Sequence, residues 1–120
     1  MATKRRPAVI DDARVVLPFC GYTNERGDWW AHPDGDIRNV SGDVRYEKEF
    51  WLDANWIHGT LIPALATLFP PKWGIDVFHG WDGAPVLVYF FGVGVETLRG
   101  TGPTFEAAMI SAAARAVRSV

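Results

Sequence analysis

Cysteine is nearly absent from this chain, and long apolar runs are missing altogether. Cys20 is the one cysteine, which excludes an internal disulfide and a cluster of thiolate metal ligands. The longest apolar stretch, residues 85–95, is too short to span a bilayer and is interrupted by Gly92 and Gly94. The basic N-terminus is not followed by an apolar segment of secretory length. We therefore expect a cytoplasmic protein that does not enter a membrane.

An excess of either charge is also lacking. The chain has 12 basic and 14 acidic residues, which gives a formal net charge of −2. This balance is neither the basic footprint of a typical nucleic-acid-binding protein nor the strong acidity of a DNA mimic. Three basic residues stand together at positions 4, 5 and 6, where we expect a solvated tail that could touch nucleic acid.

Tryptophan, by contrast, is abundant. A chain of 120 residues that is 48% hydrophobic is typical of one globular domain with its own core. We assign residues 1–13 to a flexible tail and residues 14–120 to a single domain. Each tryptophan has a large apolar body and one N–H to satisfy, so a surplus of them indicates a filled core, an aromatic contact surface, or both. The six are Trp29, Trp30, Trp51, Trp56, Trp73 and Trp81.

The first half of the chain predicts an N-terminal β-hairpin. Residues 14–22 are rich in β-formers, and Pro18 within them favours an edge strand or a bend. Residues 23–27 have the composition of a turn, and residues 28–32 return as a short strand. We interpret residues 37–49 as a loop that contains one extended piece near residues 44–46.

The second half predicts a helix over residues 53–69. Asp53 is a suitable N-cap, and apolar residues from Trp56 to Leu68 recur at helical spacing. Pro63 should kink this helix, because its ring clashes with the carbonyl four residues earlier, which belongs to Gly59. The alternative is a short turn followed by a helix over residues 61–69.

A three-stranded antiparallel sheet is predicted over about residues 75–99. The strands are residues 75–81, 86–91 and 93–99, with a hairpin at Asp82-Gly83. The middle strand is apolar at every position, so we expect helices to cover both of its faces. Thr104 is expected to cap a last helix, residues 104–118, whose alanines permit close approach to the sheet. The fold class is therefore α+β.

The candidate groups for catalysis or metal binding are few. His32, Asp34 and Asp36 combine an imidazole and two carboxylates in one loop, a donor set that suits zinc or iron. Their spacing matches no established metal signature, and turns rich in Asp and Gly are common for backbone reasons alone. Cys20 is conceivable as a nucleophile, but a lone cysteine in an apolar run is usually a core residue. We predict no catalytic residues, no bound metal and no cofactor.

Trp29 and Trp30 are the predicted protein-binding residues. Neighbouring residues of a strand point to opposite faces, so one of the two indoles can be buried while the other is exposed or covered. Exposed tryptophans often anchor protein interfaces. Alternatively, the N-terminal tail or residues 37–49 could cover the second indole, and no partner protein would then be needed to explain two neighbouring tryptophans.

Two resemblances follow from the order of the predicted elements. Residues 53–118 resemble a double-stranded RNA-binding domain. The predicted order there is a helix, three strands and an alanine-rich helix, which begins in the segment Gly100-Thr-Gly-Pro-Thr-Phe-Glu-Ala-Ala108. In that family the last helix begins with lysines that contact phosphates, whereas Thr104, Phe105 and Glu106 stand here. The likeness is topological, and the charge that supplies affinity is missing.

A second resemblance is to small bacteriophage proteins of the NinX-like, or phage ABA-sandwich, type. It rests on Trp30-Ala-His-Pro-Asp-Gly35, on Leu52-Asp-Ala-Asn-Trp-Ile57, and on the turn and alanine-rich helix from Gly100 to Ala114. It covers about residues 14–118 and implies a phage or prophage origin and an α/β/α sandwich. It brings no catalytic residues.

The function we expect is therefore that of a non-enzymatic, phage- or prophage-encoded binding protein that acts through protein–protein contact. Inhibition of a host defence system is one form of this, and self-association is left open. One alternative is a nucleic-acid-binding module with the double-stranded RNA-binding topology. The other is a small metal-dependent enzyme built on the histidine–aspartate loop.

Overall fold

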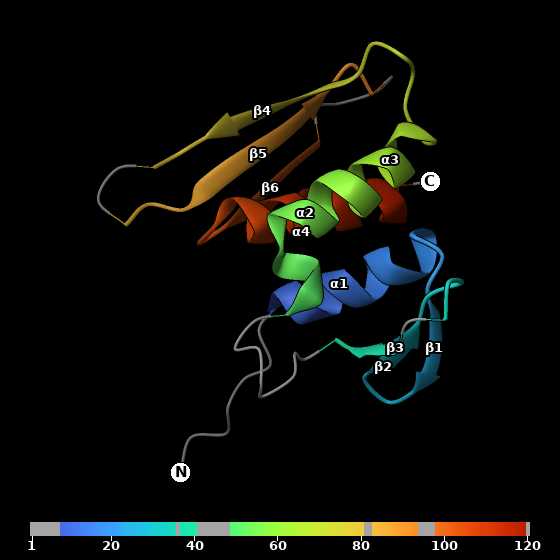
Figure 1. Cartoon of the computed structure of the whole chain (residues 1–120). Coiled ribbons are helices and arrows are strands. Elements are labelled where there is room, and N and C mark those ends of the chain that lie inside the picture. Colours follow the sequence, from blue (N-terminus) through green and yellow to red (C-terminus); the bar gives the residue numbers. More distant parts are fainter. Residues whose placement is uncertain (1–7, 36, 41–48, 81–82, 94–97, 120) are drawn as a thin grey trace.

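The computed structural model describes residues 8–35, 37–40, 49–80, 83–93 and 98–119 (Figure 1). They form helices and two small antiparallel sheets, which confirms the α+β class. The helical elements are α1 (Ala8–Phe19), η1 (Phe50–Leu52), α2 (Ala54–Trp56), η2 (Ile57–Leu61), α3 (Ile62–Ala66) and α4 (Phe105–Arg118). The strands are β1 (Thr23–Arg26), β2 (Trp29–Ala31), β3 (Ile37–Asn39), β4 (Gly74–Phe78), β5 (Val86–Phe91) and β6 (Leu98–Gly102).

The large sheet has the strand order β4–β5–β6, with every pair antiparallel. The predicted sheet and the central position of β5 are thus confirmed. The third strand is residues 98–102, however, and not residues 93–99; residues 94–97 and Asp82 of the predicted hairpin lie outside the described residues. The segment Gly100-Thr-Gly102 had the composition of a loop, but its glycines belong to β6 for a packing reason.

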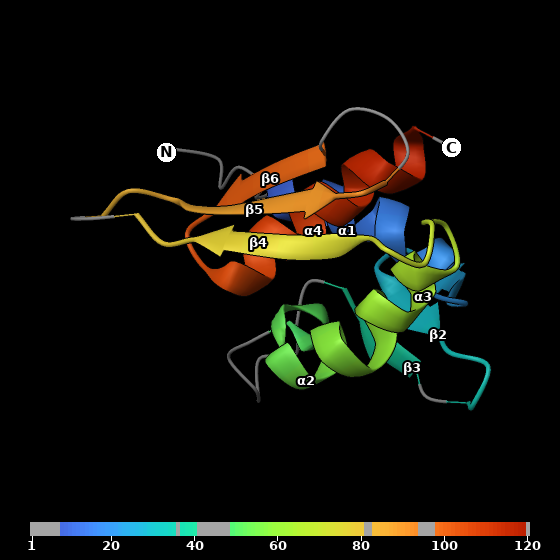
Figure 2. The same cartoon turned by 90° about the horizontal axis from the view of Figure 1, so that it is seen from above.

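Helix α4 lies directly on the glycines of β6. A Cβ placed on Gly100 would be 2.2 Å from the backbone nitrogen of Ala112, and one on Gly102 would be 2.7 Å from the Cβ of Ala107. Only glycine in the strand and small residues in the helix allow this approach. The predicted close contact between the alanine-rich helix and the sheet is confirmed, and Figure 2 shows α4 behind the strands.

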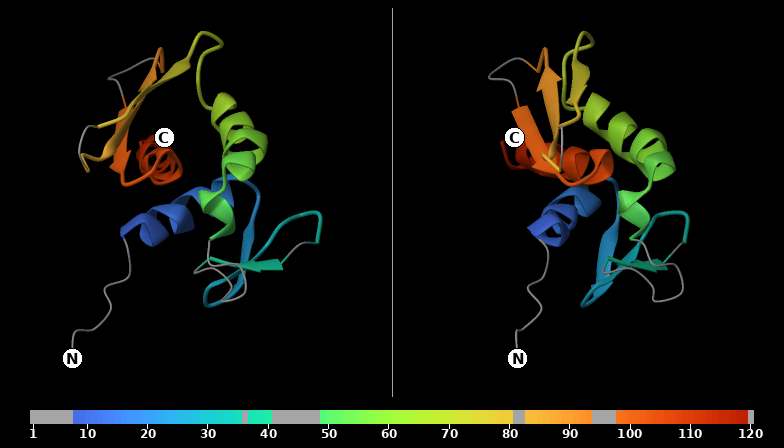
Figure 3. Two further views of the ribbon diagram at one scale, coloured as in Figure 1. Left: turned by 60° about the vertical axis from the view of Figure 1, so that its left-hand side comes forward. Right: turned by 90° about the vertical axis from the view of Figure 1, so that its left-hand side faces the viewer.

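The helices cover only one face of the large sheet. Val86, Val88 and Phe90 are buried, whereas Leu87 and Tyr89, which alternate with them, are half-buried. Figures 1 and 3 show the helices on a single side of β4–β6. Within the described residues, the prediction that helices cover both faces is therefore wrong. An apolar run shows that a strand has a buried face, but not which face is buried.

The helix predicted for residues 53–69 is present as α2, η2 and α3, but it ends at Ala66. Asp53 is its N-cap, and the carboxylate accepts a bond from the Trp56 N–H at 3.2 Å. In η2 the Ile62 N–H donates to the Ile57 carbonyl, five residues earlier, which makes one wide π turn immediately before Pro63. A π turn of this kind accommodates a proline without ending the helix.

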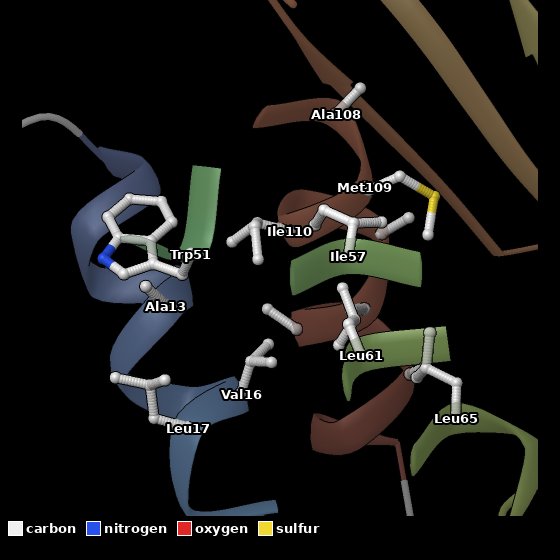
Figure 4. Packing of buried hydrophobic residues seen from close by; sticks show 14 of the residues in the cluster. Ala13, Val16, Leu17, Trp51, Ile57, Leu61, Leu65, Ala108, Met109 and Ile110 are labelled. Atoms are coloured by element: carbon white, nitrogen blue, oxygen red, sulfur yellow. The ribbon is translucent and has the colours of Figure 1, made fainter. Parts of the chain in front are cut away.

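The predicted strand over residues 14–22 is wrong, because residues 14–19 belong to α1 and residues 20–22 form the turn and link that follow it. The helix begins at Ala8, so residues 8–13 of the predicted tail are helical as well, while residues 1–7 lie outside the described part. β-Branched residues and Pro18 favoured a strand locally. Helical spacing nevertheless buries Ala13, Val16 and Leu17 between α4 and the rest of the core (Figure 4). Tertiary packing overrides the weak local preference.

The small sheet, with the order β1–β2–β3, lies on the other side of α1 from α4 (Figure 1). The N-terminal hairpin therefore exists, but its first strand is β1, within the residues predicted to be a turn. Strand β3 falls in the predicted loop 37–49, and residues 44–46 lie outside the described part. The molecule is thus layered as large sheet, α4, α1 and small sheet, with α2–α3 alongside α4 (Figure 3).

Candidate protein-binding surface

The outer face of the small sheet presents a tryptophan, an isoleucine and an arginine. Trp29 pairs with Arg26 across β1 and β2, and Ala31 pairs with Ile37 across β2 and β3. Because paired and alternate residues share a face, Trp29, Ala31 and Ile37 project from the same side of the sheet. Arg26 stands across from Trp29 beside a bulge, where the register shifts between Asn24 and Arg26. Trp29 is 47% exposed and Ile37 is 58% exposed, and Arg26 is exposed too.

Trp30 points to the opposite face and is only 7% exposed. The predicted division of the two indoles, one buried and one exposed, is therefore present. Among the described residues, the buried Trp30 Nε1 has no hydrogen-bond partner, so this side chain contributes through apolar packing. Of the two predicted binding residues, Trp29 is accessible to a partner and Trp30 is part of the core.

An aromatic cluster holds the small sheet against the helices. Tyr22 is central to it: its ring lies 4.8 Å from His32, 5.7 Å from Phe50 and 6.4 Å from Trp56, measured between centroids. The Trp56 Nε1 donates to the Tyr22 hydroxyl at 3.1 Å. The Arg38 guanidinium lies 5.6 Å from the centre of the Phe50 ring, a cation–π contact.

Two polar links add to this attachment. Arg14 of α1 forms an ion pair with Asp28 in the turn between β1 and β2. The indole nitrogen of the fully buried Trp51 donates to the Val40 carbonyl at 2.7 Å, immediately after β3. The outer face that contains Trp29 is therefore presented by a fixed platform.

The candidate metal ligands are only partly described. The Asp34 N–H donates to His32 Nδ1 at 3.3 Å, and a carboxylate oxygen of Asp34 lies 3.1 Å from the same nitrogen. The Gly35 N–H donates to the His32 carbonyl at 2.8 Å, so these residues close a tight turn. Asp36 lies outside the described residues, and within those residues no group of three or more potential ligands gathers. The metal-dependent enzyme therefore stays the untested alternative that the sequence left open.

Cys20 is poorly suited to nucleophilic chemistry. Burial raises the pKa of its thiol from 9.0 to about 12, so the sulfur is protonated at neutral pH. The thiolate is the nucleophilic form, and reactive cysteines have a lowered pKa. Burial also raises the pKa of the Tyr22 hydroxyl, although the hydrogen bond from Trp56 opposes this. Both groups therefore contribute as neutral parts of the packing between α1 and β1.

The order of helix, β4, β5, β6 and α4 matches the topology predicted from the RNA-binding resemblance. The residues at the start of α4 are already engaged within the chain, however. The Thr104 hydroxyl already accepts the bond from the Ala107 N–H at 3.2 Å, and the Phe105 ring stacks on His58 with centroids 6.0 Å apart. Glu106 adds a negative charge at this end of the helix. These features disfavour a contact with RNA phosphates.

Sequence reasoning singled out Trp29 but missed Arg26 and Ile37. The available signal for Arg26 was the dipeptide Gly27-Asp28, which is suited to a two-residue hairpin turn and predicts the Arg26–Trp29 pair. Comparison of the chain with protein-family models, with curated proteins and with solved structures finds no match. No helix in the described part of the chain is both long enough and apolar enough to cross a membrane.

Proposed function

We propose that this chain is a non-enzymatic binding protein that contacts another protein through the outer face of its small sheet. Trp29 is the anchor, and Arg26 and Ile37 flank it. The observation on which this depends is that Trp29 stays nearly half exposed on a strand whose next residue, Trp30, is fixed in the core. Tryptophan is one of the residues that most often anchor protein interfaces, and here it lies beside an exposed isoleucine and an exposed arginine.

The composition of this face resembles that of interface hot spots. Tryptophan and arginine are the residues most enriched at such positions, and a large side chain that is already fixed loses little entropy on binding. Arg26 stands directly across the strand pair from Trp29. The partner that fits best has an apolar pocket for the indole and a carboxylate at its rim for the guanidinium.

The likeness to small phage proteins extends this proposal to origin and target. We infer a phage or prophage gene product that acts on a host or phage protein inside the bacterial cytoplasm. Inhibition of a host defence protein is a function that simple occupation of a surface can perform, and it requires neither a catalytic group nor a cofactor.

Capture from a bacterial lysate tests the proposal. Immobilised protein is compared with Trp29→Ala and with Phe78→Ala, which removes an equally exposed aromatic from the large sheet. We expect a defined set of captured proteins that is lost with Trp29→Ala, retained with Phe78→Ala, and reduced at least tenfold with Arg26→Glu. Circular dichroism checks that each variant is folded.

Three results would count against the proposal. Capture that is unchanged by Trp29→Ala would show that the partner binds elsewhere. Capture of nucleic acid in place of protein, with steep loss at higher salt, would favour the RNA-binding alternative. Stoichiometric metal in the purified protein, removed by His32→Ala, would favour the metal-dependent enzyme.

A further inference from the structure

The outer face of the large sheet is an ordered apolar patch with one charge on each side. It is formed by alternate residues of the three strands, and none of the described helices lies over it (Figures 1 and 2). Phe78 is 55% exposed and Phe91 is 43% exposed. The residues of this face are Asp76 and Phe78 of β4, Leu87, Tyr89 and Phe91 of β5, and Arg99 and Thr101 of β6.

The aromatic rings on this face are held in place before any partner arrives. Phe78 meets Tyr89 edge to face, with centroids 5.5 Å apart and planes at 90°. The Phe91 ring lies across the neighbouring strand at Gly74, where an added Cβ would be 2.2 Å from it. An aromatic ring that covers a glycine of the adjacent strand is a known stabilising arrangement in sheets. The patch is therefore a shaped surface with little entropy left to lose.

The charges of this face have a definite symmetry. The strand register places Asp76 on one side of Tyr89 and Arg99 on the other, at the same level along the strands. Because strands are about 4.8 Å apart, the two charges are separated by about 10 Å within one chain. One edge strand is thus negative and the other is positive, with an apolar centre between them.

We propose that this face packs against the same face of a second copy of the chain. A two-fold axis parallel to β5 exchanges the two edges, so Asp76 of each copy lies opposite Arg99 of the other, and Tyr89 lies opposite Tyr89. A two-fold axis across the strands would instead oppose like charges. The pattern is therefore self-complementary in one orientation, as an isologous interface requires, and it keeps the strands aligned as in sheet-on-sheet packing.

The size of the patch sets the expected strength of this dimer. Three short strands on each side bury about 1,000 Å² in total, near the lower limit for a specific interface. We therefore expect reversible dimers in the micromolar range and not an obligate dimer. The proposal is independent of the function assigned to Trp29, because that residue lies on the other sheet.

Sedimentation velocity over a concentration series tests this dimer through charge reversal. Wild-type protein should shift from monomer to dimer as its concentration rises. Asp76→Arg gives two positive edges and Arg99→Asp gives two negative edges, so each variant alone should dimerise at least tenfold more weakly. An equimolar mixture of these two variants should dimerise again, because one copy then opposes the other with complementary charges. Glu25→Arg, a reversal on the exposed strand β1, is the matched control and should behave as wild type.

The double variant Asp76→Arg/Arg99→Asp provides a second check, because it exchanges the two edges and should restore self-association. Both residues are exposed, so folding should be unaffected, and circular dichroism verifies this. A wild-type chain that stays monomeric throughout the series would overturn the proposal. So would a dimer that both single reversals leave unchanged, since it would have to form through another surface, such as a strand edge.

Discussion

The two three-stranded sheets of this protein are attached to the core in different ways. The inner face of the large sheet contributes Val86, Val88 and Phe90 to the core, and β6 lies against the backbone of α4. In the small sheet Trp30 is the only buried strand residue. The large sheet is thus an integral part of the core, whereas the small sheet depends on one indole and on the aromatic cluster around Tyr22.

This difference teaches how one short chain combines stability with an exposed binding surface. The large sheet is stabilised by many small contacts. A substitution of one side chain there is therefore tolerated, unless the substitution alters the spacing between helix and sheet. A sheet attached through a few side chains can present the rest of its surface outward. It should also open locally at lower free energy than the core.

The largest effect should come from the spacing between β6 and α4. Gly100→Ala places a methyl group against the backbone nitrogen of Ala112 and the carbonyl of Ala108, neither of which can move without displacing the helix. We expect the free energy of unfolding to fall by about 4 kcal/mol. Chemical denaturation followed by circular dichroism measures this loss.

Gly59→Ala is the matched control for this substitution. Its added Cβ meets nothing within 4 Å, and it lies inside a helix, where alanine is favoured. We expect a change between zero and a gain of about 1 kcal/mol. Equal losses in the two variants would show that the close approach of α4 to β6 is not what makes glycine necessary.

The next effect tests the dependence of the small sheet on one indole. Trp30→Ala should lower the free energy of unfolding by about 3 kcal/mol, because it leaves a large cavity beneath β2. Hydrogen exchange should show faster exchange in β1–β3, while the amides of β5 keep most of their protection. A uniform loss of protection in both sheets would contradict the idea that the small sheet is a separately opening unit.

The third effect is a loss of stability at alkaline pH, and the two groups that cause it, Cys20 and Tyr22, lie next to the small sheet. The pKa of Cys20 is raised to about 12, and that of Tyr22 is raised too, both by burial. Between pH 9 and 12 the unfolded chain therefore releases protons that the folded chain keeps, and stability falls as the pH rises. We expect roughly 1 kcal/mol per pH unit, and a clearly shallower slope in Cys20→Ala. Thermal unfolding across this range measures both slopes, and identical slopes would exclude the thiol as the cause.

The elements that sequence alone predicted correctly are those in which local pattern and packing agree. The cap at Thr104 and the apolar stripe that follows it predicted α4, and the apolar run from Val86 to Phe91 predicted the central strand. Helix α1 was missed because its β-branched residues and Pro18 favour a strand locally. What makes it helical is contact with α4, about 100 residues later in the chain, which no local pattern records.

The candidate site was predictable to a similar degree. The period of a strand requires Trp29 and Trp30 to point in opposite directions, and this followed from sequence. Which of them is buried depends on where α1 and the ring of Tyr22 lie, and α1 had been missed. The open face of the large sheet was unpredictable for the same reason, since coverage depends on the three-dimensional arrangement of the helices.

The smallest effect compares the exposed aromatics of the two sheets. The Phe91 ring covers Gly74, so Phe91→Ala should lower the free energy of unfolding by about 1 kcal/mol, the usual size of a cross-strand contribution. Trp29→Ala should change it by less than about 0.5 kcal/mol, as is usual for surface substitutions, because its exposed indole is argued to serve binding and not folding. Denaturant titration of both variants under one set of conditions resolves the difference. If Trp29→Ala were instead the more costly change, its indole would be a structural part of the small sheet, and its exposure would no longer argue for a partner.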